Sequence, residues 1–296
     1  MFQILKMQLM ADKVLLIDFK APRIAKSCLP GQFLILRLDE KGERIPLTIS
    51  DYNREKGIIT VVFQKMGVST TRLARLSPGD YVQDIIGPLG KPSDLCIEEN
   101  LDEIRKKKIV FIGGGVGTAP IYPQVKWLNE HGVKSTVIMG SRTKDLLFYL
   151  EEMEAVADEL YIATDDGTYG FHGMVTNQLQ ELINTGREYD HCVAIGPMIM
   201  MKFVCKLTAE LGIHTVVSMN PIMVDGTGMC GACRILVDGK IKFACVDGPE
   251  FNGHQVDFDL ALQRMQQYKS EEGRAYLRYI EGDTHHGGCG NCGGDR

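Results

Sequence analysis

A Gly-rich loop with two cysteines, within residues 219–250, constrains this chain more than any other stretch. Cys230 and Cys233 lie three positions apart in it. The residues between Cys233 and Cys245 read as two short strands joined by an Asp-Gly turn, which brings Cys245 back towards the loop. Glycines let a backbone wrap closely around a bulky group, and thiolates are the soft ligands that iron-sulfur clusters and zinc prefer. The stretch therefore predicts a metal site.

The cysteine spacing favours one kind of metal. Plant-type 2Fe-2S proteins use C-x4-C-x2-C and a distant fourth Cys. The loop matches this pattern with Asp225 in place of the first Cys. One oxygen ligand among three thiolates should give a potential different from that of an all-Cys cluster. The predicted ligands are Asp225, Cys230, Cys233 and Cys245.

Two other interpretations of these cysteines stay open. Free Cys is among the most buried residue types, so the thiols can be structural, although this does not explain the glycines. Alternatively, Cys230 and Cys233 pair with Cys289 and Cys292 as two C-x2-C knuckles for tetrahedral zinc. That site would leave Cys245 without a role and would need a far longer loop than zinc ribbons use.

Composition narrows the class of protein. With 296 residues, 44% hydrophobic and 24% charged, the chain suits two domains and an appendage. A net charge of -5 without a basic block argues against nucleic acid or an anionic membrane surface, so we expect protein and small-molecule partners. The chain has no long apolar run and no secretory signal, and its nine cysteines cluster in C-x2-C pairs, so we expect a reduced, cytoplasmic protein.

Residues 1–100 predict a small antiparallel β-barrel. Short β-rich runs alternate with turn signals such as Pro30-Gly31 and Pro78-Gly79-Asp80. No helix longer than residues 70–76 fits. The expected strands are residues 13–20, 32–38, 45–50, 57–64 and 81–86.

Two features of this barrel suit a phosphorylated cofactor. On one strand, the Arg44 guanidinium can fork onto a pyrophosphate, and Thr48 adds a hydroxyl. At the start of the helical segment, free N–H groups and hydroxyls of Gly67, Ser69 and Thr70 favour an anion. Each feature alone has a plainer interpretation, a solvated Arg or a helix N-cap. Together they favour a cofactor site.

A charged linker at residues 102–108 precedes a change of pattern, and strands and helices alternate over residues 106–218. This alternation predicts a doubly wound parallel sheet. A buried strand at 109–112 leads into a Gly-rich turn at 113–120. Further strands are expected at 135–139, 159–163 and 191–195, and helices at 121–130, 145–157, 175–184 and 197–211.

The Gly-rich turn is where such a sheet accepts dinucleotide phosphates, although tight packing of helix on strand also explains its glycines. No acidic residue ends the second strand, so the motif does not separate NAD from NADP. Asp165 and Gly196 follow later strands at the edge where open sheets bind ligands, so we expect them beside the nicotinamide or its ribose. A turn or helix cap is the alternative for the pair Asp165-Asp166.

Residues 251–296 follow the cluster loop. Apolar residues recur at helical spacing up to Ile280, and we expect this face to pack on the chain itself, with a subunit contact as the alternative. The tail carries His285, His286, Cys289 and Cys292 in a Gly-rich context, and we expect a loosely tethered end.

The order of these motifs resembles the ferredoxin reductase superfamily. The resemblance rests on Arg44-x-Pro46-Leu47-Thr48 in a barrel, a Gly-rich nucleotide turn, Gly196-Pro197 at a strand end and the late cysteine loop. Within the superfamily, the chain resembles the electron-transfer subunits of dihydroorotate dehydrogenase. Residues 220–231 are more similar still to the small (alpha) subunits of NADH-dependent reduced ferredoxin:NADP oxidoreductases, also described as sulfide dehydrogenase subunits.

The resemblance implies FAD in the barrel, NAD(H) on the second domain and a 2Fe-2S cluster in the loop. Two residues depart from the relatives: Ser69 replaces a common glycine of the flavin loop, and Ile195 stands where many reductases have a Cys before Gly-Pro. The implied FAD residues are Arg44, Pro46, Leu47, Thr48, Gly67, Ser69 and Thr70, and the implied NAD(H) residues are Gly114, Gly115, Gly117, Thr118, Asp165 and Gly196.

Electron transfer between NADH, FAD and the cluster is the predicted function. Nicotinamides exchange two electrons as hydride and a cluster accepts one, so a flavin is the necessary converter. Hydride transfer between nicotinamide C4 and flavin N5 needs no catalytic acid-base side chain. The resemblance adds a larger partner subunit with FAD and 4Fe-4S clusters, which couples NADH, NADPH and ferredoxin by electron bifurcation in a heterodimer or larger complex. A dihydroorotate- or sulfide-oxidising partner, and a zinc-stabilised nucleotide-sensing module without redox turnover, are the alternatives.

Overall fold

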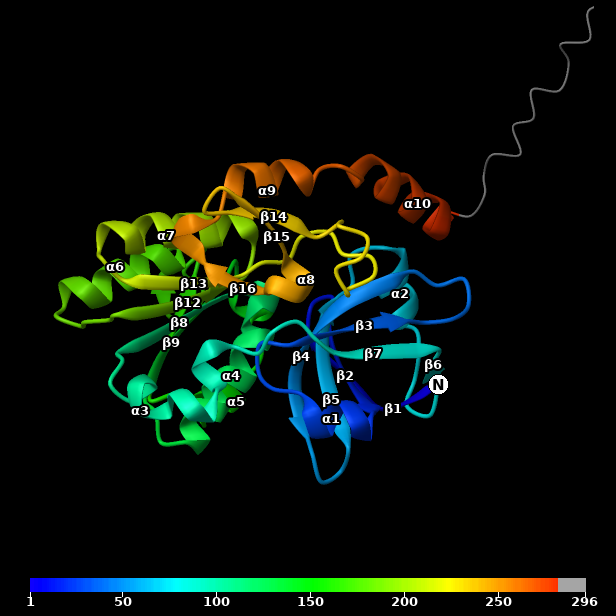
Figure 1. Cartoon of the computed structure of the whole chain (residues 1–296), viewed down its shortest axis with the longest axis horizontal. Coiled ribbons are helices and arrows are strands. Elements are labelled where there is room, and N and C mark those ends of the chain that lie inside the picture. Colours follow the sequence, from blue (N-terminus) through cyan, green and yellow to red (C-terminus); the bar gives the residue numbers. More distant parts are fainter. Residues whose placement is uncertain (282–296) are drawn as a thin grey trace, which may run out of the picture.

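Three β-sheets organise residues 1–281, the part of the chain that the computed structural model describes (Figure 1). A seven-stranded antiparallel sheet is followed by a seven-stranded, mainly parallel sheet and a two-stranded hairpin. Within residues 1–281, no helix is long and apolar enough to cross a membrane. The predicted tail with His285, His286, Cys289 and Cys292 lies outside the described residues.

The first sheet is a nearly closed barrel. Its strand order is β6-β1-β2-β5-β4-β3-β7, so β6 and β7 are the two edge strands. Only Gln83 separates these edge strands in the sequence, so the sheet has to curl until its two edges lie near each other. Its elements are β1 (Phe2–Ala11), β2 (Val14–Lys20), α1 (Pro22–Ser27), β3 (Phe33–Arg37), β4 (Arg44–Asn53), β5 (Ile58–Gln64), α2 (Val68–Leu73), β6 (Tyr81–Val82) and β7 (Asp84–Leu89).

Every second side chain of a strand points into the barrel, because successive side chains of a strand point to opposite faces. Ile59, Val61 and Phe63 of β5 are buried and pack with Ile17 and Phe19 of β2 in one core. The predicted antiparallel barrel is therefore confirmed.

Two parts of the barrel differ from the expected strands. β1 was not expected, because only Ile4 and Ala11 are buried along its ten residues and the sequence shows no alternating apolar pattern. The expected strand 81–86 is divided into β6 and β7, because the Gln83 N–H donates to the Leu38 carbonyl (3.0 Å) between them.

The second sheet has the order β11-β10-β9-β8-β12-β13-β16, and only β16 runs antiparallel to its neighbour. β8 is buried at all six positions: Val110 and Ile112 face one core and Ile109 and Phe111 face the other. Helices therefore cover both faces, which confirms the doubly wound prediction (Figure 1). Its elements are α3 (Leu101–Ile104), β8 (Ile109–Gly114), α4 (Thr118–Glu130), β9 (Ser135–Ser141), α5 (Leu150–Glu154), β10 (Glu159–Thr164), β11 (Phe171–His172), α6 (Val175–Asn184), β12 (His191–Ile195), α7 (Met198–Glu210), β13 (His214–Ser218) and β16 (Glu250–Asn252).

The helix expected over residues 145–157 is largely absent, since α5 has only five residues. Phe148 and Tyr149 are buried against Val14, Leu16 and Val62 of the barrel. Tyr149 adopts a left-handed φ of 61°, which interrupts a helix. Contact with the barrel has overridden the local helical preference.

The C-terminal elements extend from the second sheet, where β16 and α9 (Phe258–Arg264) pack, to the barrel, where α10 (Lys269–Glu281) contacts α2. β14 (Arg234–Val237) and β15 (Lys240–Phe243) form the predicted hairpin, and Asp238 and Gly239 have the positive φ values of its turn. α8 (Ala244–Asp247) and β16 follow. The expected helical run is divided into α9 and α10. α10 contacts α2, and the guanidinium of Arg75, just after α2, lies 4.9 Å from the ring centroid of Tyr279 in α10. No residue of α10 is buried.

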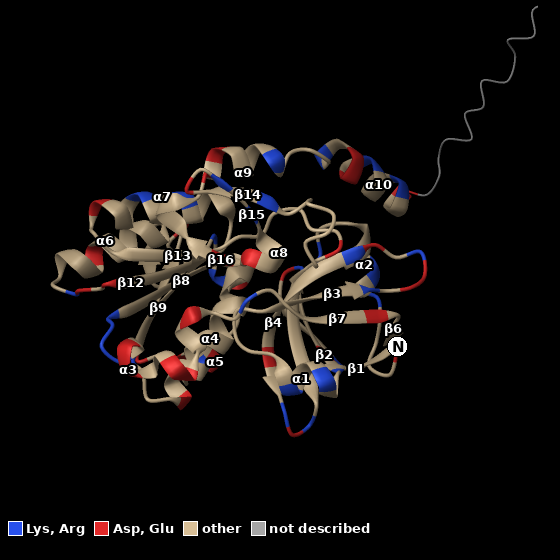
Figure 2. Ribbon diagram, viewed as in Figure 1, with Lys and Arg blue, Asp and Glu red and all other residues tan. Residues whose placement is uncertain are grey.

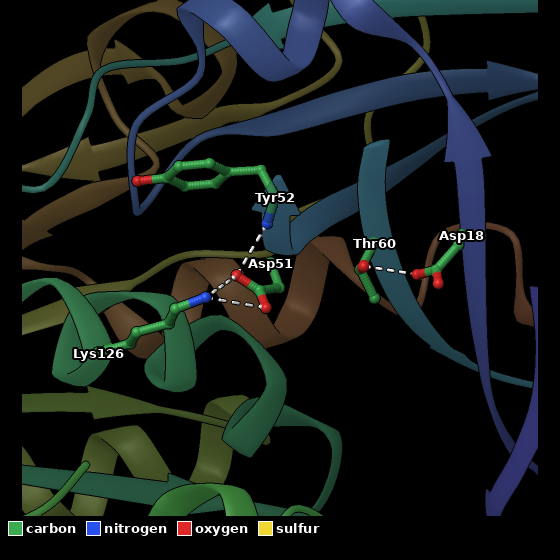
Figure 3. A network of polar contacts seen from close by, with 5 residues as sticks. All are labelled: Asp18, Asp51, Tyr52, Thr60 and Lys126. Atoms are coloured by element: carbon green, nitrogen blue, oxygen red, sulfur yellow. Dashed lines mark hydrogen bonds and ion pairs between the residues drawn. The ribbon is translucent and has the colours of Figure 1, made fainter. Parts of the chain in front are cut away.

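A polar contact joins the barrel to the second sheet. Lys126 Nζ of α4 lies 2.8 and 3.1 Å from the two carboxylate oxygens of Asp51 on β4 (Figure 3). Asp51 also accepts the Tyr52 N–H (2.8 Å). Acidic and basic residues are interspersed over the elements in Figure 2.

Candidate functional site

The first group of predicted cofactor residues lies on β4. Arg44, Pro46 and Thr48 alternate along the strand and share one face, and Arg44 and Pro46 are exposed. Leu47 points to the opposite face, where it packs on the barrel core opposite Leu34. A cofactor on this strand would therefore meet the side chains of Arg44, Pro46 and Thr48. It would meet only the backbone of Leu47.

The start of α2 lies beside the start of β4. The Ser69 hydroxyl donates to the carboxylate of Glu43, the residue before Arg44. Thr70 Oγ1 accepts the N–H groups of Met66 (3.0 Å) and Gly67 (3.1 Å). The Thr70 hydroxyl thus shapes the turn, whereas the space beside Gly67 is open. The structure brings both predicted phosphate features to one rim of the barrel.

Glycines of the second sheet meet where β8 and β12 end. A Cβ on Gly117 would lie 2.1 Å from the Ile195 carbonyl oxygen, and one on Gly114 would lie 2.3 Å from Met200 Sδ. Gly117 meets backbone atoms and is therefore needed for packing, in agreement with the plainer interpretation of the turn, whereas Gly114 meets the flexible end of the Met200 side chain. Gly115 has φ +54° and open space beside it, so it is the position where a ligand can approach the backbone.

The remaining predicted nucleotide residues border the same edge. Gly196 contacts Gly114, since a Cβ on Gly196 would lie 3.0 Å from the Gly114 carbonyl oxygen. Thr118 is only 3% exposed, so its side chain is buried beneath the turn. Asp165 is exposed, and its N–H donates to the Ser141 carbonyl (3.1 Å). Asp166 caps a turn by accepting the Thr168 N–H (3.0 Å).

The cysteine loop is organised by the Asp225 carboxylate. Its two oxygens accept the N–H groups of Thr227 (3.0 Å), Met229 (3.1 Å) and Cys230 (2.9 Å). These hydrogen bonds, that of Thr227 foremost, hold the pKa of Asp225 below its ordinary value. A carboxylate has about four lone-pair sites, so three accepted bonds leave one for a cation.

The thiols of the loop are only partly gathered. Cys233 Sγ and Cys245 Sγ are buried and 3.2 Å apart, whereas Cys230 is exposed. Burial, and then the Cys233 thiol, raise the pKa of Cys245 to about 12. Across residues 1–281, no three His, Cys, Asp or Glu side chains converge closely enough to hold a metal ion. The donor types and the positive φ values of Gly226, Gly228 and Gly231 nevertheless fit a loop that wraps an iron-sulfur cluster.

The loop packs directly on the barrel. A Cβ on Gly226 would lie 2.7 Å from Ile35 Cγ1 and 3.0 Å from Leu89 Cδ1. Ile35 also packs with Cys233 and Cys245 in one buried cluster. On β3, Ile35 pairs with Pro46 of β4, so a single strand separates the cysteines from the predicted flavin residues. Sequence reasoning missed Ile35 and Leu89, because nothing distinguishes them from other core residues of a strand.

Comparison with known families defines the class of protein. The family of oxidoreductase NAD-binding domains matches residues 111–206. The iron-sulfur cluster binding domain of dihydroorotate dehydrogenase B matches residues 220–257. The chain is therefore an oxidoreductase that combines a nucleotide-binding sheet with an iron-sulfur domain.

Individual relatives narrow the class to a family. A dihydroorotate dehydrogenase B (NAD(+)) electron transfer subunit homolog of Thermotoga maritima is 44% identical over 94% of this chain and 95% of its own. A Clostridium beijerinckii protein described as an uncharacterized protein in the adh 3' region is 56% identical over the full length of both chains. The chain belongs to the family of dihydroorotate dehydrogenase B electron-transfer subunits, which confirms the resemblance found in the sequence.

A solved relative agrees in structure. One chain of an NADH-dependent reduced ferredoxin-NADP oxidoreductase, a structure presented for its insights into flavin-based electron bifurcation, superposes with a TM-score of 0.86. The two chains are 44% identical, and the match covers 94% of this chain and 97% of that one. The family and this relative support FAD, NAD(H) and an iron-sulfur cluster as cofactors and electron transfer as the activity. The name electron-transfer subunit also implies a second subunit.

Proposed function

We propose that this chain passes electrons between NAD(H), FAD and a 2Fe-2S cluster. The observation that carries the proposal is the position of the cysteine loop, which lies on β3 next to the flavin-type residues of β4. Val116 of the Gly-rich turn packs against the buried cluster that contains Val62 of the same barrel. Three sites that are distant in the sequence thus border one barrel.

Particular residues are assigned to each cofactor in this proposal. Arg44, Pro46 and Thr48 contact the flavin, and the α2 start binds its pyrophosphate through backbone N–H groups. The NAD(H) phosphates approach at Gly115, where the backbone is open. The full proposed sets are Arg44, Pro46, Leu47, Thr48, Gly67, Ser69 and Thr70 for FAD, Gly114, Gly115, Gly117, Thr118, Asp165 and Gly196 for NAD(H), and Asp225, Cys230, Cys233 and Cys245 for the cluster.

In this mechanism the chain binds, orients and insulates the cofactors. The flavin, when bound, supplies the conversion between two-electron and one-electron transfer. Ile195 has no ionisable group, so no acid-base side chain is proposed before Gly196. Ile35, Leu89 and Phe33 form an apolar floor beneath the loop, which keeps water from the side of the loop that faces the barrel.

The partner, the complex and the compartment are proposed on the same basis. We propose a larger subunit with FAD and 4Fe-4S clusters, within an electron-bifurcating NADH-dependent ferredoxin:NADP oxidoreductase, because the structural match to that enzyme is close. A dihydroorotate- or sulfide-oxidising partner is the second candidate. The proposed compartment is the cytoplasm, because thiolate ligands persist in a reducing environment.

The proposal is tested by anaerobic titration of the purified chain with NADH. We expect the flavin absorbance to bleach and the electron paramagnetic resonance signal of a reduced cluster to appear. Cys245→Ser should abolish the cluster signal, whereas Cys28→Ser, a buried thiol of the barrel core, should preserve it. A colourless protein that contains zinc would instead support the nucleotide-sensing alternative. Purification from the native host, followed by identification of the associated chain, decides between the partners.

A further inference from the structure

We infer that Arg264 is a positioning residue for the cluster loop and that its charge raises the reduction potential of the cluster. The inference rests on the proposed cluster ligands. Arg264 Nη2, at the end of α9, donates to the Ala232 carbonyl oxygen (3.2 Å). Ala232 lies between the proposed ligands Cys230 and Cys233, so this contact holds the turn that connects them.

α9 is fixed in place by contacts at its beginning and along its buried side. Asp257 caps the helix by accepting the Leu260 N–H (2.9 Å), and the Asp257 N–H donates to the Leu236 carbonyl of β14 (2.9 Å). Ala261 is 4% exposed and belongs to the same core as Ile235. Because α9 is anchored to the hairpin that brings Cys245 back, Arg264 reaches the loop from a rigid support.

A second guanidinium lies nearby. Arg234 Nη1 is 3.5 Å from the Gly231 carbonyl oxygen, and Arg234 and Arg264 border one small cavity with Ala232. Within residues 1–281, neither Arg forms an ion pair with a carboxylate. In Figure 2, Lys and Arg residues are visible on α9 and on the β14–β15 hairpin. Two positive charges without an ion-pair partner among these residues therefore border the loop.

The electrostatic consequence follows from the charge of the cluster. One-electron reduction adds a negative charge, and a nearby guanidinium, which stays charged at any physiological pH, favours that state. Hydrogen bonds and charges around a cluster are established determinants of its potential. Removing Arg264 should therefore make the cluster harder to reduce.

The test uses the full chain as Arg264→Gln and Arg264→Lys variants, with Lys202→Met as the matched control. Lys202 of α7 pairs with Asp259 (2.6 Å) of α9, the helix that also carries Arg264. Lys202 does not contact the loop. We expect Arg264→Gln to decrease the equilibrium constant for one-electron reduction about tenfold, which is ~59 mV for a one-electron couple. Arg264→Lys should retain most of the wild-type reduction potential, because the positive charge is kept. Lys202→Met should leave the potential unchanged. The measurement is a redox titration monitored by electron paramagnetic resonance, after iron analysis of each variant.

Hydrogen exchange of the peptide that contains residues 226–236 gives a readout independent of the cluster. We expect faster exchange in Arg264→Gln than in Lys202→Met. Normal iron content with an unchanged potential in Arg264→Gln would overturn the electrostatic inference, and unchanged exchange would overturn the positioning role. Wild-type protein without iron would contradict the proposed function instead, while the exchange result would still decide the contact of Arg264 with the loop.

Discussion

At the scale of single residues, the Asp225 carboxylate combines one observed role with one proposed role. Its carboxylate binds three backbone N–H groups of its own loop, and it occupies the position of the first ligand in the cysteine pattern. The sequence indicated the second role through spacing alone. It could not indicate the first, because hydrogen bonds within an irregular loop leave no periodic signal.

Substitution of Asp225 separates these roles. Asp225→Ala removes every acceptor, so we expect loss of most of the iron. Asp225→Cys offers a thiolate, so we expect a retained cluster with a changed potential. Asp238→Asn, which removes a charge at the hairpin turn, is the control and should change neither quantity. An unchanged potential in Asp225→Cys would mean that Asp225 is not a ligand.

Glu250 predicts a pH dependence of stability. Gln124 Nε2 donates to Glu250 Oε1 (2.7 Å) where β16 meets α4, and burial raises the pKa of Glu250 from 4.5 to about 7. The folded chain therefore holds a proton that the unfolded chain releases between these pH values. This contribution to stability is complete below pH 4.5 and is lost as the pH rises through about 7.

Glu250→Gln keeps the hydrogen bond with Gln124 and removes the titration. We expect its stability relative to wild type to increase as the pH rises from about 5 to about 8, because only the wild type loses the bound proton. Urea midpoints across that range provide the measurement. Parallel pH profiles for the two proteins would show that Glu250 is ionised in the folded state with an ordinary pKa.

Elements with strong internal patterns were predictable, and those defined by distant contacts were not. α6 was expected at residues 175–184 and lies there, since its apolar residues Val175, Leu179 and Leu182 follow a helical period. β1 was missed because it depends on its pairing with β2, and the shortening of α5 was missed because it depends on contact with the barrel. The periodicity of a sequence indicates which face of an element is buried. It does not indicate which other element packs against that face.

The close approach of the Gly-rich turn to the end of β12 predicts the effect of adding a single methyl group. Gly117→Ala places a Cβ 2.1 Å from the Ile195 carbonyl oxygen, so the backbone has to shift. We expect a loss of about 2–4 kcal/mol in the free energy of unfolding. Gly273→Ala is the matched control, because Gly273 lies in α10 with open space around it. That variant should be unchanged or more stable by up to about 1 kcal/mol. Equal stability of the two variants in urea would contradict the packing role of Gly117.

At the scale of the whole molecule, the barrel contacts both other units. Lys126 and Asp51 connect it to the second sheet, and Ile35 supports the cysteine loop. The order of motifs along the chain allowed the three units and their cofactors to be predicted. The sequence could not show that the cysteines pack on β3, the strand next to β4. Strand order in a barrel depends on pairings between distant residues.

The Asp51–Lys126 pair predicts a modest coupling between the two sheets. Its side chains are 28% and 30% exposed, so solvent weakens the attraction. A double-mutant cycle with Asp51→Asn and Lys126→Met should give a coupling energy of about 0.5–1 kcal/mol. Denaturation in urea at low salt and at high salt measures it, and the high-salt value should be smaller. No coupling at low salt would show that the apolar contact of Val62 with Phe148 and Tyr149 joins the units without help from the pair.

We propose above all that the cysteine loop, together with Cys245, binds a 2Fe-2S cluster beside the flavin barrel. The most direct test of this proposal is analysis of iron and acid-labile sulfide in the chain produced alone under anaerobic conditions. We predict about two irons and two sulfides per chain. Zinc in place of iron, or the absence of both iron and sulfide, would contradict the account.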